Sequence, residues 1–185
     1  MRETVGINIA NLTLKNLCDA PEWNSHPYSC KYCIYWEYPE ECIDPEKEKK
    51  EKNLQKKIAW LKNTLKKFGN CGKILYVDKK PVGYAQYAPP EFLPNAFRYP
   101  IKPDENAVLI SCLFIVQKDF RRIGLGTKLL QSIIGDLLNR KIKAVETFAR
   151  KDNPENPSGP IDFYLKNGFK IHKDDKEFPL MRLEL

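Results

Sequence analysis

Short apolar runs alternate with segments of helical periodicity along this chain. The run 107–116 is almost entirely apolar, which is typical of a strand buried on both faces. Two β-rich runs, 71–77 and 81–87, are separated by three polar residues and predict a hairpin. Further strands are predicted at 4–9, 143–148 and 178–185.

Helices are predicted between these strands. One apolar stripe has spacings of 4, 3, 4 and 3 and stops at Gly69; it consists of Leu54, Ile58, Leu61, Leu65 and Phe68. A wider apolar face runs from Leu125 to Leu138, and a short helix is predicted at 160–167. The proline-rich stretch 88–104 predicts a long loop. This order predicts one domain over 1–185 of the α/β (α+β) class.

Composition and charge narrow the class of protein. The 185 residues are 42% hydrophobic, which supports a folded core, and the net charge is +7. Nine Lys and three Glu within 46–67 supply +6 of that charge, and we interpret them as a solvated helix face rather than a nucleic-acid patch. Neither an apolar run of about 18 residues nor a signal-peptide core is present, so we expect a cytoplasmic protein without a membrane partner.

The segment 11–44 is rich in cysteine and aromatic residues. Cys30 and Cys33 form a Cys-x-x-Cys pair that Cys18 and Cys42 could complete as a zinc site, although the spacings 12, 3 and 9 are not standard. A redox-active thiol pair and simple buried thiols are the alternatives. A zinc- or thiol-sensing module that uses these cysteines is therefore the alternative function.

A candidate anion site lies between the predicted strand 107–116 and the helix after it. In the stretch 120–128, two glycines, two arginines and a helix start together favour a bound phosphate. The order Gly126-Thr127-Lys128 does not fit a nucleotide-hydrolase phosphate loop, and Leu129 stands where a dinucleotide fingerprint needs a glycine.

Two segments resemble one known family. The residues Val116 to Gly126 resemble the acyl-CoA-binding motif of the GCN5-related N-acetyltransferases (GNAT), in which Arg/Gln-x-x-Gly-x-Gly/Ala opens a helix. The segment Phe163 to Phe169 resembles the Tyr-x-x-x-Gly-Phe segment of the same family. The resemblance covers about 72–185. Lys118 departs from it where many members have proline, and Asn156 is offset by about one residue from the family's asparagine.

The resemblance implies a fold, a reaction and a binding site. The fold would be a mixed, twisted sheet flanked by helices, and the reaction would move an acetyl group from acetyl-CoA to a primary amine by direct attack. A module that binds acyl-CoA without catalysis is the alternative. The implied cofactor-binding residues are the backbone of Phe114, Ile115 and Val116 for the pantetheine arm, the pyrophosphate cradle of Arg121, Arg122, Ile123, Gly124, Leu125, Gly126 and Thr127, and Asn156.

The resemblance also implies catalytic groups. Tyr164 would be the general acid, because a phenol with a pKa near 10 can protonate a thiolate whose conjugate acid has a pKa near 8.5. A packing aromatic is the alternative role. Glu146 is the first candidate for the general base, with a water chain as the alternative. Neither His26 nor His172 lies at a position that matches the family.

The acceptor side is less defined by sequence. Trp36 and Glu37 lie in the region that usually walls the acceptor pocket in this family, and together they could hold a cationic amine. An aromatic mini-core is the alternative. The acceptor is expected to be a small-molecule amine or a protein amino group, and a homodimer is left open.

Overall fold

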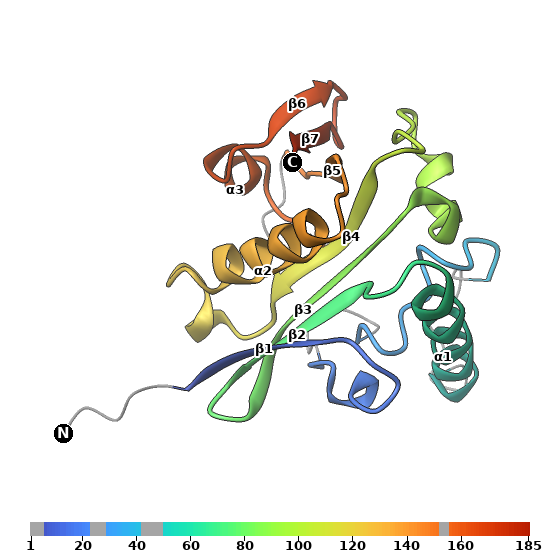
Figure 1. Ribbon diagram of the computed structural model, residues 1–185, viewed down its shortest axis with the longest axis vertical. Helices are drawn as coiled ribbons and strands as arrows, with labels where there is room; N and C mark the ends of the chain where they lie inside the picture. The colour runs from blue at the N-terminus through green and yellow to red at the C-terminus, as the bar shows by residue number, and fades with distance from the viewer. Residues whose placement is uncertain (1–5, 23–28, 42–49, 152–155) are drawn as a thin grey trace.

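A mixed sheet dominates the structure (Figure 1). The computed structural model describes residues 6–22, 29–41, 50–151 and 156–185. Seven strands of these residues form one sheet in the order β1-β2-β3-β4-β5-β7-β6. The strands are β1 Ile7–Asn11, β2 Gly72–Val77, β3 Lys80–Ala88, β4 Val108–Ile115, β5 Ala144–Phe148, β6 Lys170–Lys173 and β7 Leu180–Glu184. The predicted mixed sheet is confirmed, since β4 and β5 are parallel and the other neighbours are antiparallel.

The central strand β4 separates from β5 along its length. The two strands pair only at Val108 to Ile110 of β4, so the second half of β4 lies outside this pairing. On its other side, β4 stays paired with β3 up to Ile115, with a bulge between Ile110 and Cys112. The splayed half of β4 therefore leaves one strand edge available to partners other than a strand of the sheet.

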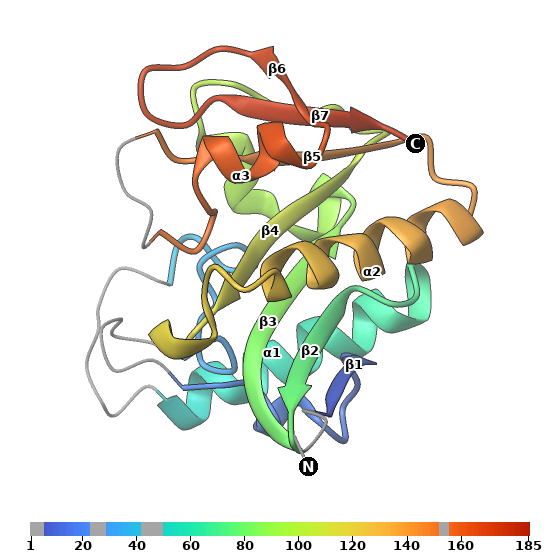
Figure 2. The same cartoon turned by 90° about the vertical axis from the view of Figure 1, so that its left-hand side faces the viewer.

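Helices cover both faces of the sheet (Figure 1). Helix α2 (Leu125–Asn139) and helix α3 (Ile161–Lys166) share one apolar core, whereas helix α1 (Lys50–Lys67) packs into a second core with the chain around Trp36. Figure 2 shows that α2 begins beside the end of β4 and that α3 lies on the same side of the sheet. The sheet thus separates an α2 and α3 face from an α1 face.

Most predicted elements are confirmed, with shifts at their ends. The hairpin turn places Asp78 and Lys79 at positive φ, as in the type I′ turn that fits the twist of a two-strand hairpin. The predicted strand 4–9 is observed as Ile7–Asn11, and residues 1–5 lie outside the described part. The predicted loop 88–104 contains two short 3₁₀ helices, Pro90–Phe92 and Pro94–Arg98.

Two expectations were incomplete. The edge strand β6 was not predicted, because Lys170 to Lys173 are all exposed and carry no alternating apolar pattern. In α1 the most buried face lies beside the predicted stripe. It consists of Asn53, Lys57, Trp60, Leu61 and Thr64, while Leu54, Ile58, Leu65 and Phe68 are only partly buried. A buried lysine explains the difference, because a search for periodic apolar residues does not count a charged residue as a core position.

None of the helices in the described residues combines the length and apolar character needed to cross a membrane.

Candidate functional site

The turn that follows β4 forms the predicted anion cradle. Arg122 and Gly124 have φ values of 62° and 87°, so the backbone reverses direction before α2 begins at Leu125. Gly124 is the N-cap of α2 and tolerates this left-handed conformation without a steric penalty. The first N–H groups of an α-helix have no partner within the helix and carry the positive end of its dipole. The cradle therefore presents donors and positive potential to an anion.

A pocket of about 550 Å³ opens directly onto this cradle. Its walls are the end of β4, the start of α2 and one side of α3. The lining residues are Leu113, Phe114, Ile115, Arg121, Arg122, Gly124, Gly126, Thr127, Asn156, Gly159, Pro160, Asp162, Phe163 and Lys166. A volume of this size is typical of sites for drug-sized ligands and cofactors.

Arg121 shapes the pocket by holding the end of β4. Its Nε donates to the carbonyl of Ile115 at 2.7 Å, and its second guanidinium nitrogen donates to the carbonyl of Val116 at 3.1 Å. These bonds fix the direction in which the chain leaves the strand. Arg122, in contrast, is exposed at the pocket rim, where its guanidinium can meet an anion.

The edge of β4 that faces the pocket carries a specific backbone contact. The N–H of Leu113 donates to the carbonyl of Pro157 at 3.2 Å, whereas the N–H of Val116 donates to Val82 of β3 at 2.9 Å. The segment 156–160, which we call the strap, thus lies against β4. Asn156, Gly159 and Pro160 of the strap also line the pocket.

The structure gathers most of the predicted cofactor residues around the pocket. Those in the lining are Phe114, Ile115, Arg121, Arg122, Gly124, Gly126, Thr127 and Asn156. Three others are not: the N–H of Val116 is used by β3, Ile123 is 62% exposed, and Leu125 packs in the core. Their backbone roles stay predictions.

Sequence reasoning missed one wall of the pocket. The residues Asp162, Phe163 and Lys166 of α3 and the strap residues Gly159 and Pro160 were not predicted to line the cofactor pocket. The positions 162, 163 and 166 lie on one side of a helix, and this spacing could have indicated that they face the same pocket. A side chain at Gly126 would lie 3.4 Å from the ring of Phe163, so α3 closes onto the start of α2.

Tyr164 lies beside the pocket rather than in its lining. The side chain is completely buried in the core shared by α2 and α3, and its hydroxyl donates to the carbonyl of Ser158 at 2.8 Å. Burial raises the pKa of Tyr164 above its ordinary value, so the phenol keeps its proton at neutral pH. Its role as a general acid stays a prediction.

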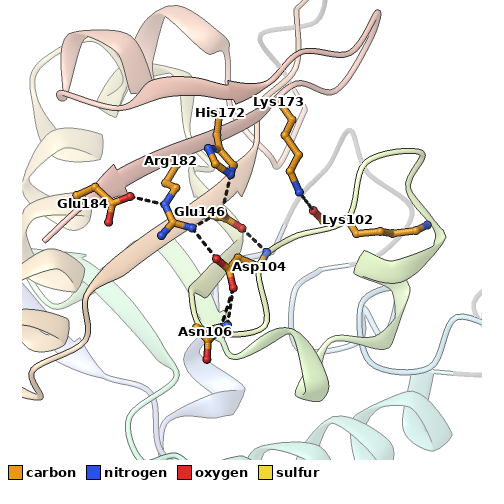
Figure 3. Close-up of polar contacts among 8 residues, drawn as sticks. All are labelled: Lys102, Asp104, Asn106, Glu146, His172, Lys173, Arg182 and Glu184. Atoms are coloured by element: carbon orange, nitrogen blue, oxygen red, sulfur yellow. Dashed lines mark hydrogen bonds and ion pairs between the residues drawn. The ribbon is translucent and has the colours of Figure 1, made fainter.

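Glu146 sits in a polar network on the α1 face of β5 (Figure 3). Its fully buried carboxylate accepts from Arg182 at 3.0 Å and from the backbone N–H of Asp104 at 2.9 Å, and it lies 3.9 Å from His172. Asp104 precedes β4, whereas the pocket is at the opposite end of that strand. The contacts of Glu146 are those of a structural anchor, and its role as base stays a prediction. His26 lies outside the described residues.

Trp36 and Glu37 are buried on the α1 face of the sheet. The ring of Trp36 stacks on Tyr99 with a centroid distance of 5.5 Å. The Oε1 atom of Glu37 forms an ion pair with Lys57 and accepts from Gln86 Nε2 at 2.7 Å. Lys57 therefore already neutralises the carboxylate that we expected to attract an amine, and binding of the acceptor by Trp36 and Glu37 stays a prediction.

The cysteines do not form a metal site within the described part of the chain. Cys18, Cys30, Cys33, Cys71 and Cys112 are free thiols there, and no three His, Cys, Asp or Glu of these residues are grouped to hold a metal ion. Burial raises the pKa of the Cys30 and Cys33 thiols, which lowers their thiolate content. Cys42, the fourth member of the expected set, lies outside the described residues.

Comparisons with solved structures show the same fold in known acetyltransferases. The PaiA N-acetyltransferase from Thermoplasma acidophilum, solved in complex with coenzyme A, aligns with a TM-score of 0.59 and 15% identity over 97% of this chain and 99% of its own. An N-acetyltransferase from Staphylococcus aureus Mu50 aligns with a TM-score of 0.61 and 13% identity over 97% and 98%.

A third relative has a named protein substrate. The ribosomal-protein-S18-alanine N-acetyltransferase from Escherichia coli aligns with a TM-score of 0.51 and 16% identity over 97% of this chain and 94% of its own. A search of curated protein sequences finds no match. The model of the acetyltransferase (GNAT) family matches residues 31–169, which include β4, the cradle and α3. The chain therefore belongs to the GNAT family of acetyltransferases.

Proposed function

We propose that this protein transfers an acetyl group from acetyl-CoA to a primary amine by direct attack. The observation that carries the proposal is the pocket at the splayed end of β4, which joins a helix N-terminus to a strand edge that β5 no longer pairs with. A helix N-terminus suits a diphosphate, and a strand edge suits the amides of a pantetheine arm. The complex of the Thermoplasma relative with coenzyme A supports the same ligand here.

The residues around the cradle fit this ligand chemically. The amides at the start of α2 would hold the diphosphate, and Arg122 at the rim would add a full positive charge. Gly126 keeps the approach open, because any larger side chain would project toward Phe163 across the pocket. Lys166, which also lines the pocket, adds a second cation. Among the described residues of the lining, Asp162 is the one acidic side chain, so cations outnumber carboxylates there. Apolar surface comes from the β4 residues Leu113, Phe114 and Ile115.

The chemistry needs two proton movements. A bond forms between the amine nitrogen and the acetyl carbon, and the bond from that carbon to sulfur breaks. The amine gives up a proton, and the sulfur takes one up. We propose that the proton taken up by the sulfur comes from the Tyr164 hydroxyl. This hydroxyl stays protonated at neutral pH because burial raises its pKa. We assign the amine proton to water, because the Glu146 carboxylate is buried away from the pocket and already accepts from Arg182 and from the Asp104 N–H.

The acceptor is a small-molecule amine or a protein amino group. The name of the Escherichia coli relative gives a ribosomal protein as its substrate, which keeps the second class open. We also propose a cytoplasmic location, because the five cysteines in the described residues are free thiols, as in reducing compartments.

The direct test is release of coenzyme A thiol from acetyl-CoA in the presence of a panel of amines and amino-terminal peptides. We expect turnover with at least one acceptor, and we expect Tyr164→Phe to lower kcat by about 10–100-fold without weakening coenzyme A binding. Saturable coenzyme A binding without turnover on any acceptor would favour a non-catalytic acyl-CoA-binding protein instead.

A further inference from the structure

The strap Asn156–Pro160 contacts the same edge of β4 that the proposed function assigns to the pantetheine arm. The carbonyl of Pro157 accepts from the N–H of Leu113 at 3.2 Å, and Leu113 lines the pocket. This inference rests on the proposed function, because it concerns how coenzyme A gains access to that edge.

The geometry of β4 makes this N–H the relevant donor. In an antiparallel pair, successive residues direct their N–H groups to opposite edges of the strand. Val116 donates to β3, so Ile115 and Leu113, one and three residues before it, direct their N–H groups to the pocket edge. A ligand chain that starts at the cradle and runs back along β4 passes Ile115 first and Leu113 next. Its acyl end therefore arrives where the Pro157 carbonyl lies.

Side-chain contacts hold the strap in this position. The Tyr164 hydroxyl donates to the carbonyl of Ser158 at 2.8 Å, and the Asn156 carboxamide accepts from the N–H of Ser158 at 2.9 Å. Gly159 lies against the Tyr164 ring, where an added Cβ would be 3.3 Å from Cε2, and its φ of 79° suits glycine. Tyr164 thus holds the strap against β4 with both its ring and its hydroxyl, and we call this side chain the latch.

We propose that the strap and the pantetheine arm compete for the Leu113 N–H, and that the strap leaves β4 when coenzyme A binds. The departure of Ser158 frees the Tyr164 hydroxyl, which then becomes available as the proton donor. Coenzyme A binding therefore also makes the Tyr164 hydroxyl available as the general acid. Tyr164 is a latch when the strap lies on β4 and a donor only after the strap has moved.

The competition predicts an unusual effect on affinity. A ligand that must first displace a closed conformation binds with an apparent affinity reduced by the fraction of open molecules. The bond between the Tyr164 hydroxyl and Ser158 favours the closed conformation, so its removal should tighten binding. We expect Tyr164→Phe to lower the Kd for coenzyme A by roughly two- to tenfold, as for the loss of one ordinary hydrogen bond.

Hydrogen exchange of the intact wild-type protein tests the movement without any acceptor. Backbone amide exchange is followed with and without saturating coenzyme A, and saturation is verified by calorimetry. We expect the amide of Arg150, which lies outside the strap and donates to the Gly159 carbonyl at 2.9 Å, to exchange at least several-fold faster with coenzyme A. The Leu113 amide should stay protected, because its acceptor is replaced rather than lost.

Calorimetry of two variants completes the test. Tyr164→Phe removes the latch hydroxyl, and Tyr87→Phe is the matched control, since its hydroxyl is bonded to Asp136 away from the strap. Tighter coenzyme A binding by the first variant alone supports the proposal. If coenzyme A saturates the wild type while exchange of the Arg150 amide is unchanged, or if Tyr164→Phe binds no more tightly than the control, the strap does not compete. If coenzyme A does not bind at all, the proposed function fails and this inference fails with it.

Discussion

A lysine in a protein core needs a partner for its charge, and Lys57 has several. Its side chain is only 3% exposed, and it forms an ion pair with Glu37 and donates to Gln86 Oε1 at 2.8 Å. Tyr84 donates to the same Gln86 oxygen at 2.9 Å, so the network joins α1, β3 and the segment around Trp36. Burial alone would lower the pKa of Lys57, but the Glu37 carboxylate outweighs it, and the pKa is raised.

Removal of one charge of this ion pair should lower the free energy of unfolding more than removal of both charges. Glu37→Gln leaves the Lys57 charge buried without its counter-charge, and we expect the free energy of unfolding to fall by about 3–5 kcal/mol. The double variant Glu37→Gln, Lys57→Met removes both charges and should recover most of this loss. Urea unfolding at neutral pH measures both values. A double variant as unstable as the single one would show that the pair itself, rather than an unpaired charge, accounts for the cost.

The same pair predicts a dependence of stability on alkaline pH. The folded-state pKa of Lys57 is higher than its ordinary value of 10.5, so folding favours the protonated form. Its contribution to stability is complete below pH 10.5 and is lost as the pH rises through the folded-state value. Wild type should therefore lose more stability than the double variant when urea midpoints are compared above pH 10.5. Parallel curves for the two proteins would contradict the raised pKa.

Neighbouring elements pack closely against Gly72 at the start of β2. A Cβ on Gly72 would lie 2.9 Å from the carbonyl oxygen of Ala85 on β3 and 2.9 Å from Cβ of Leu12. Backbone at this distance cannot move aside without disturbing the sheet. Gly135 of α2 is the opposite case, because a Cβ there would meet no atom within 4 Å.

These two glycines give a matched pair of substitutions. We expect Gly72→Ala to lower the free energy of unfolding by about 1–3 kcal/mol through overpacking. Gly135→Ala should raise it by about 0.5–1 kcal/mol, because alanine loses less conformational freedom than glycine in a helix. Chemical denaturation of the two variants checks both signs. Equal stabilities would mean that β2 and β3 are further apart than the structure places them.

The elements that could be predicted from sequence are those with a strong local signal. The strand β4 is apolar throughout and α2 carries a wide apolar face, so both were found within one or two residues of their ends. The strand β6 was missed because its four residues are exposed and three of them are polar. It is a strand only because Lys170 to Lys173 pair with β7. Such pairing does not require an alternation of apolar and polar residues in the segment itself.

Over the whole molecule, the two faces of the sheet differ in how far sequence defines them. The cradle is built from consecutive residues, so its motif could be recognised before its geometry was known. The α1 face is assembled from distant segments: Glu37, Lys57 and Gln86 meet only after folding, and Glu146 joins Arg182 and Asp104 in the same way. These ion pairs could not be predicted from spacing along the chain. The sequence therefore contained no sign that the candidate acceptor and base residues are buried and already paired.

The central claim is that a diphosphate binds at the start of α2, and calorimetry with coenzyme A tests it most directly. Gly126→Asp places a negative charge and a side chain in the cradle, while Gly135→Asp adds the same charge further along the helix, where a Cβ meets no neighbour. We predict that the first variant weakens coenzyme A binding by roughly tenfold or more and that the second stays within about twofold of wild type. Equal binding by both variants and the wild type would contradict this account.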